Sequence, residues 1–434
     1  MSFNTAKIML NPSMRKYSIG LKPIAIYLVI LFVLFSGQTL IDENSGILSR
    51  IPLIFGIVMM VSAFIFWNRK HNYRLALILF VLLSDLMLFA IVIGPCDVFE
   101  GFKDYIEQYS MGIAFALVCS TWNDISFILN LLVKVALINA IYGVLFFIPA
   151  FSSLANLFMK IGFSSGITDS ENRLCGLQKD PNFMGLLAAP ACLIALYNIK
   201  NNRSPLNIIV GIILLVALFF TYSRTAWLSF LFGLFVYFMI YDGQFKTRRI
   251  ALTLVLLFLF LYYFNSSAAL ISLKNFNERF DLTVTNSRSW IWNFWYQQFL
   301  AKPFGYGVGS IEEIRKLAVL KDTFNEVRPH NYYLNVLIEG GIQSLTVLLS
   351  IIALCFYRIW STIQKCHEEK NRQTAILLFS LISLMSVGIF GLGGMFQLMT
   401  LFMGMCLSTD ILIEKEKGYP QKYIANLPEK NPPQ

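Results

Sequence analysis

Charged residues are scarce in this sequence of 434 residues. Asp, Glu, Lys and Arg together make up 14% of the chain, whereas hydrophobic residues make up 56%. A soluble globule could not cover its surface with so few polar groups. The composition therefore predicts an all-α polytopic membrane protein.

Cysteine and acidic clusters are also sparse. The seven cysteines form no CxxC pair and show no zinc-type spacing, and no DxD-like carboxylate pair is present. No metal and no cofactor is therefore expected. Most cysteines lie in apolar runs and are interpreted as packing residues, whereas Cys96 and Cys175 fall in expected outer loops, which leaves a disulfide between them open. No cleavable signal peptide is expected either.

The net charge of +10 does not by itself indicate nucleic acid as a partner. In a membrane protein, basic residues accumulate in cytoplasmic loops, and others contact anionic lipid or a phosphorylated substrate. Membrane lipid is therefore an expected partner and nucleic acid is not.

Long apolar runs recur along the chain. A helix needs about 20 apolar residues to cross a hydrocarbon core of about 30 Å, and the runs predict about 12 transmembrane helices. The expected spans are residues 23–40, 51–67, 73–94, 107–121, 126–149, 182–198, 206–222, 225–241, 250–265, 341–360, 373–390 and 393–412.

Lysine and arginine in the short connections give the orientation. The basic segments before the first span, after spans 2, 6, 8 and 10 and in the tail all fall on one side, which the positive-inside rule makes cytoplasmic. Both termini are therefore expected inside. Residues 1–264 would hold spans 1–9 with a shorter outer loop at about 151–181, residues 265–330 a large outer loop, residues 331–412 spans 10–12, and residues 413–434 a cytoplasmic tail.

The large outer loop contains two further patterns. Residues 290–296 (WIWNFWY) predict an aromatic-rich amphipathic helix that lies at the membrane interface. Residues 303–309 (PFGYGVG) follow, and their glycines allow the backbone to approach another segment closely.

Three arginines are candidate anion ligands. Arg224 lies in TYSRTA between two apolar runs; it would either hold phosphate oxygens together with helix-terminal amides, or reach the interface while the hydroxyls beside it cap a helix. Arg288 is either a phosphate ligand or a solvated loop residue. Arg173 is a weaker candidate, and Asp180-Pro-Asn182 in the same stretch also resembles an ordinary helix cap.

The stretch Arg328-Pro-His330-Asn331 to Gly341 returns the polar loop to apolar sequence. His330 could accept a proton from a hydroxyl, since imidazole has an ordinary pKa of about 6.5. On one continuous helix, Glu339 would lie roughly opposite His330 and would therefore not pair with it directly. Glu339 is then either a substrate ligand or a helix-packing residue.

At these residues the chain resembles the bacterial O-antigen ligase and polymerase superfamily. The resemblance covers about residues 165–345 and rests on the stretches 173–182, 221–226 and 286–309 and on the motif HNxxLxxLxExG from His330 to Gly341. The family often has another glycine shortly after this motif, where this chain has Gln343-Ser344. That difference bears on helix packing and leaves the histidine unaffected.

The resemblance implies a metal-independent glycosyltransferase with a GT-C-like fold, whose site faces the periplasm from the inner membrane. The donor would be a glycan on undecaprenyl diphosphate, and a chain-length regulator is a further expected partner. His330, Arg288 and Arg224 would be catalytic residues. Five others would bind substrate: Arg173, Asn182, Arg328, Asn331 and Glu339.

Two acceptors fit the resemblance. A polymerase joins lipid-linked repeat units, and a ligase transfers glycan to lipid A–core; the stretch 173–182 favours the polymerase. A lipid-linked oligosaccharide flippase, with a similar number of spans, is a remoter alternative, because its spans would carry more polar residues than these.

Overall fold

The computed structural model describes residues 105, 108, 109, 112, 119, 121–160, 166–167, 173–178, 180–241, 286–319, 329–391 and 396–418. The regular secondary structure of these residues is helical, with one isolated β-bridge between Ile167 and Leu174; turns and loops connect the helices. The helices are α5 (Trp122–Leu145), α6 (Ser152–Lys160), α7 (Pro181–Asn201), α8 (Pro205–Phe220), α9 (Arg224–Tyr241), α12 (Asn286–Ala301), α13 (Ser310–Val319), α14 (Tyr332–Lys365), α15 (Glu369–Gly391) and α16 (Phe396–Gly418), with a 3-10 turn at Pro149–Phe151.

The long helices begin at side chains that satisfy their first amide groups. Thr121 and Asp124 form a capping box at α5, and Asp180 and Ser204 cap α7 and α8, each followed by a proline at the start of the helix. Asn331 caps α14 in the same way. These caps fix where each helix enters the bundle.

Five helices are long and apolar enough to cross a membrane: α5, α7, α9, α14 and α15. Helices α8 and α16 coincide with two further expected spans but have shorter apolar lengths. The chain is thus a membrane protein with helices at the predicted places in this region. The expected spans before residue 107 and at 250–265 lie outside the described residues, as does most of 107–121.

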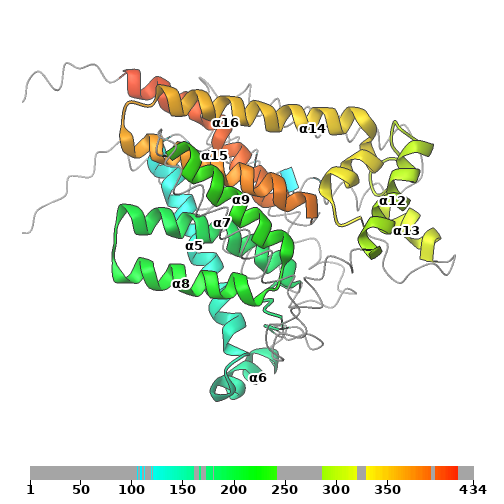
Figure 1. The fold of residues 1–434 in the computed structure, drawn as a ribbon, viewed down its shortest axis with the longest axis horizontal. Helices are drawn as coiled ribbons and strands as arrows, with labels where there is room; N and C mark the ends of the chain where they lie inside the picture. The colour runs from blue at the N-terminus through cyan, green and yellow to red at the C-terminus, as the bar shows by residue number, and fades with distance from the viewer. Residues whose placement is uncertain are drawn as a thin grey trace, which may run out of the picture.

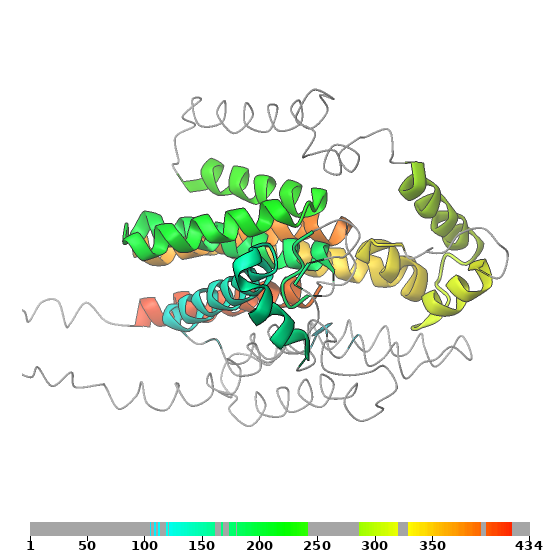
Figure 2. The ribbon, with the colours of Figure 1, turned by 90° about the horizontal axis from the view of Figure 1, so that it is seen from below.

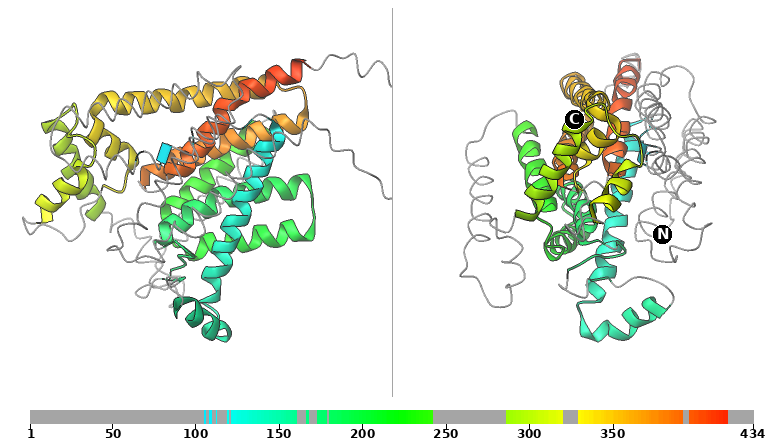
Figure 3. Two further views of the ribbon diagram at one scale, coloured as in Figure 1. Left: turned by 180° about the vertical axis from the view of Figure 1, so that it is seen from behind. Right: turned by 90° about the vertical axis from the view of Figure 1, so that its right-hand side faces the viewer.

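Helix α15 is the centre of the bundle. It packs against α7, α9, α14 and α16, and much of its length is buried. Figures 1 and 2 show α5, α7, α8, α9, α14, α15 and α16 as a bundle of elongated helices, with α12 and α13 at one end. The α7–α8 and α14–α15 turns lie at the other end, and Figure 3 shows the same arrangement from behind.

Helix α14 differs from its prediction. It begins at Tyr332 rather than near residue 341, and it is interrupted at Gly341, where φ is 74°. The predicted span thus corresponds to the part of α14 after the break, and Tyr332–Gly340 forms an additional helical segment before it. The helix predicted at residues 290–296 is confirmed as part of α12, but the prediction that it is amphipathic is wrong, because its apolar residues are spread around the helix.

Candidate functional site

Arg173 links two of the predicted site segments. Its Nε donates to the carbonyl of Thr221 at 2.9 Å, and its Nη2 donates to Oδ1 of Asn182 at 3.1 Å. The side chain is buried, and the amide of Leu174 donates to the carbonyl of Phe220 at 2.9 Å beside it. The stretches 173–182 and 221–226 therefore pack as one unit.

The turn from Thr221 to Ser223 presents Arg224 as the first residue of α9. The Ser223 hydroxyl accepts a hydrogen bond from the amide of Ala226 at 3.4 Å, which confirms the predicted cap. Arg224 is half-buried at this helix N-terminus. A guanidinium and helix N-terminal amides at one place form an environment that suits an anion.

Asp180 and Asn182 confirm the ordinary interpretation of their turn. Oδ1 of Asp180 accepts a hydrogen bond from the amide of Asn182 at 2.7 Å and thereby caps α7. The Asn182 side chain is then available to accept from Arg173. A single cap thus orders both α7 and the arginine.

Asn139 is a residue of this region that the sequence analysis missed. It is buried in α5, its Nδ2 donates to the Val135 carbonyl at 3.0 Å, and its Oδ1 accepts from the amide of Leu177 at 3.3 Å. It therefore holds the 173–178 segment on α5. The signal that could have revealed it is a lone carboxamide within an apolar run, because such groups need a partner at membrane depth.

His330 lies at the entrance to α14. It is half-buried and has a φ of 47°, and Asn331 after it caps the helix by accepting from the amide of Leu334 at 3.2 Å. The indole of Trp292 on α12 donates to the Pro329 carbonyl at 3.0 Å, which fixes the backbone before His330.

The two non-glycine residues with positive φ in the described part of the chain both lie in predicted site turns. They are Tyr222, with a φ of 48° and two residues before Arg224, and His330. Such conformations cost of order 1–3 kcal/mol and persist where the surroundings enforce them, often at functional sites.

We call residues 173–182 and 221–226 the arginine turns and residues 329–331 the histidine turn. The C-terminal end of α15 contacts α7 and α9 shortly after the arginine turns and α14 shortly after the histidine turn. On one side, a Cβ at Gly388 would lie 2.8 Å from the Leu186 side chain of α7 and 3.3 Å from the Ser229 hydroxyl of α9. On the other, the Phe390 ring packs on Trp292, with centroids 5.4 Å apart, and on Tyr333, 6.4 Å apart. Tyr333 also donates to the Ser386 carbonyl at 3.0 Å.

The loop at residues 303–309 binds the interrupted part of α14 through its backbone. The amide of Tyr306 donates to the Ile338 carbonyl at 2.8 Å, the amide of Gly307 to the Glu339 carbonyl at 2.9 Å, and the amide of Ile342 to the Pro303 carbonyl at 3.0 Å. We call this contact between 303–309 and 338–342 the glycine junction. It confirms that the loop's glycines permit a close backbone approach.

Glu339 and Gln343 complete the glycine junction with side chains. Glu339 is buried; its Oε2 accepts from the hydroxyl of Tyr105 at 2.6 Å and its Oε1 from the amide of Gly309 at 3.0 Å. Nε2 of Gln343 donates to the Phe304 carbonyl at 3.0 Å. These contacts are of the helix-packing kind, and Gln343, where the family often differs, takes part in the junction.

Of the two remaining predicted residues, Arg288 and Arg328, the structure describes only the backbone of the first. Position 288 is the third residue of α12, one helical turn before Trp292, but the side chain of Arg288 is outside the described structure. Arg328 is also outside it. Because positions four apart share a helix face, position 288 lies on the same face of α12 as Trp292. The predicted residues with described positions thus gather at one end of the bundle.

Comparison with known proteins finds a family model that matches part of the chain and a related protein. Residues 209–349, which run from α8 through the glycine junction into α14, match the family model described as O-antigen ligase. The chain is also 24% identical over 385 residues to the ComP-specific O-oligosaccharyltransferase of Acinetobacter baylyi, an alignment that covers 83% of this chain and 67% of that protein. Residues 209–349 therefore match the O-antigen ligase domain, and the two findings together support a membrane transferase of lipid-linked glycans related to the O-antigen ligase superfamily.

Proposed function

We propose that this protein transfers a glycan from undecaprenyl diphosphate to an acceptor hydroxyl on the outer, periplasmic side of the bacterial inner membrane. The observation that carries the proposal is that one end of α15 packs against α7 and α9 shortly after the Arg173 and Arg224 segments, at Leu186 and Ser229, and against α14 shortly after His330, at Tyr333. This end would lie at a membrane boundary, where cationic side chains suit a lipid-linked diphosphate. Both termini would be cytoplasmic.

Arg224 and the amides at the start of α9 would hold the diphosphate. Arg288 would join them from α12, which Trp292 holds beside the His330 turn. As the bond between the anomeric carbon and the diphosphate oxygen breaks, negative charge grows on the leaving group, and guanidinium groups stabilise it. This role needs no metal ion.

His330 would accept the proton from the acceptor hydroxyl. The acceptor oxygen then forms the new bond to the anomeric carbon, and undecaprenyl diphosphate leaves with the electron pair of the broken bond. Asn331 and Arg328 are proposed substrate contacts beside it. The substrate role of Glu339 and Arg173 remains a proposal, since their described hydrogen bonds go to protein groups.

The acceptor distinguishes the candidate functions. Polymerisation of lipid-linked repeat units is our first proposal, on the stretch 173–182, and transfer of glycan to lipid A–core is the second. The Acinetobacter relative is named as specific for ComP, so ComP is a third candidate acceptor. The flippase remains a remote alternative, because the family model that matches residues 209–349 is that of a ligase.

Complementation tests the proposal. Wild type and His330→Ala would be expressed in a polymerase-null strain that supplies the cognate repeat unit and keeps its own ligase. We expect wild type to restore a ladder of surface glycan and the variant to display a single repeat unit. Rescue of a ligase-null strain instead would identify a ligase, and transfer of glycan to co-expressed ComP alone would indicate the third acceptor.

A matched histidine control is available within the chain. His367 is exposed in the α14–α15 turn, at the opposite end of the bundle. His367→Ala should restore the ladder as wild type does. An unchanged ladder in His330→Ala, with equal amounts of protein in the membrane, would refute the catalytic role of His330.

A further inference from the structure

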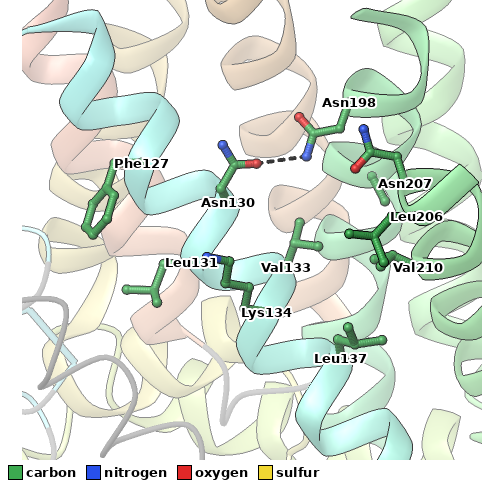
Figure 4. Close-up of a pocket in the computed structure, with 11 residues that line it drawn as sticks. Phe127, Asn130, Leu131, Val133, Lys134, Leu137, Asn198, Leu206, Asn207 and Val210 are labelled. Atoms are coloured by element: carbon green, nitrogen blue, oxygen red, sulfur yellow. Dashed lines mark hydrogen bonds between the residues drawn. The ribbon is translucent and has the colours of Figure 1, made fainter. Parts of the chain in front are cut away.

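A cavity of about 510 Å³ lies between α5, α7 and α8, towards the end of the bundle opposite the candidate functional site. Figure 4 shows the residues around it. None of them belongs to the arginine turns, the histidine turn or the glycine junction, so the cavity is a separate feature of the molecule.

One charged side chain lines this cavity. Lys134 lies midway along α5, a helix long and apolar enough to span a membrane, and it is exposed. A lysine at membrane depth is costly, and such residues usually have a partner or a function. In Figure 4 its amine points back along α5 towards Asn130.

The carboxamide of Asn130 lies one helical turn before Lys134 on α5, and the carboxamide of Asn198 on α7 is bonded to it. Nδ2 of Asn198 on α7 donates to Oδ1 of Asn130 on α5 at 2.8 Å, which ties the two helices together at the cavity wall. Positions 130 and 134 share a face of α5, so the amine and the carboxamides are neighbours. Arg203, exposed in the α7–α8 turn, adds positive charge at this end.

Apart from Asn207, the rest of the lining is apolar, and part of it is accessible. Phe127 is 48% exposed and Leu206 is 69% exposed, and Leu137 and Val210 continue the same surface. The cavity therefore offers a cation and amide donors beside a surface for hydrocarbon chains. A ligand that matches both parts is an amphipathic anion, and basic pockets between transmembrane helices are known to bind anionic lipid head groups.

We propose that this cavity is a binding site for an anionic phospholipid, separate from the site that handles the glycan donor. The phosphate would lie at Lys134 and the Asn130–Asn198 pair, with the acyl chains along Leu137, which lies farther from this end of the bundle. The bound lipid would neutralise Lys134 and fill the cavity between α5, α7 and α8.

Native mass spectrometry of the detergent-purified full chain tests this, with phosphatidylglycerol and phosphatidylethanolamine as probes. We expect one phosphatidylglycerol to bind in preference to phosphatidylethanolamine, and Lys134→Met to weaken it about tenfold, as the loss of one charge-assisted contact predicts. Lys134→Arg should keep most of the binding. Lys365→Met is the matched control, because Lys365 is exposed at the same end but does not line the cavity.

A second variant tests the cavity without changing charge. Leu137→Trp places a larger side chain in the acyl part, and it should also weaken phosphatidylglycerol binding while the protein elutes normally on size exclusion. Equal binding by wild type and Lys134→Met, or equal binding of the two lipids by wild type, would overturn the proposal. Stronger competition by a polyprenyl phosphate than by phosphatidylglycerol would overturn the assignment to phospholipid.

Discussion

The hydroxyl of Tyr105 donates a 2.6 Å hydrogen bond to the carboxylate of Glu339, across 234 positions of the chain. The other carboxylate oxygen of Glu339 accepts from the amide of Gly309. One buried side chain thus connects an early segment of the chain, the loop after α12 and the break in α14. The folded shape of the histidine turn depends on contacts that are distant in sequence.

Tyr105→Phe should destabilise the protein. The change removes one donor to a buried carboxylate, and an unsatisfied buried group costs about 1–3 kcal/mol. The expected result is a lower midpoint of thermal unfolding in detergent, measured by tryptophan fluorescence. Tyr357→Phe is the control, since Tyr357 is 72% exposed on α14, and its midpoint should equal that of wild type. Equal midpoints for both variants would show that the Tyr105 hydrogen bond contributes nothing to stability.

Gly341→Ala should disrupt the glycine junction. Gly341 has a φ of 74°, and a Cβ there would collide with the backbone of Phe304. Gly307→Ala isolates the conformational cost, because φ is 98° at Gly307 but no atom lies within 4 Å of its Cβ position. We expect Gly341→Ala to lose most of the folded protein on fluorescence-detected size exclusion and Gly307→Ala to lose clearly less. If both variants fold equally well, the close approach is not required.

Arg224→Ala should weaken binding of the lipid-linked diphosphate. A charge-assisted hydrogen bond contributes about 1.5–3 kcal/mol, so the dissociation constant should rise about tenfold to a hundredfold. Arg224→Lys should recover only part of the affinity that Arg224→Ala loses, because an ammonium lacks the planar pair of donors of a guanidinium. Equilibrium titration of the purified protein with donor measures this, and Arg203→Ala at the opposite end is the control. Unchanged affinity in Arg224→Ala would exclude it as a donor ligand.

Cys175 should resist alkylation in the folded protein. It is buried, and burial, with a smaller contribution from the Asp180 carboxylate, raises its pKa to about 12 against the opposing effect of Arg173. The reactive thiolate is then only about one part in ten thousand at pH 8. In single-cysteine variants in membrane vesicles, maleimide should label Cys366, half-buried at the other end, much faster than Cys175.

The same labelling tests the orientation predicted from charge. Cys366 ends α14 in a basic turn that the positive-inside rule places in the cytoplasm. A membrane-impermeant maleimide should therefore react with it in inside-out vesicles and not in intact spheroplasts. Labelling in intact spheroplasts would reverse the proposed orientation.

The sequence by itself determined the class of protein and most of the helix positions. Apolar runs of spanning length give helices in water-free surroundings because their backbone groups must bond internally, so α5, α7, α9 and α15 lie close to where the runs predict them. The motif around His330 likewise indicated the superfamily, because it is a local pattern.

Only the tertiary structure decided which of these residues meet. The interpretation of Glu339 stayed open because its partners, Tyr105 and Gly309, lie far away in the sequence. The packing of Arg173 on Thr221 and the support from Asn139 were equally invisible to a linear pattern. Helix periodicity specifies which face of a helix is buried, whereas long-range hydrogen bonds depend on how the helices pack, and at this site the packing follows from α15 and the break at Gly341.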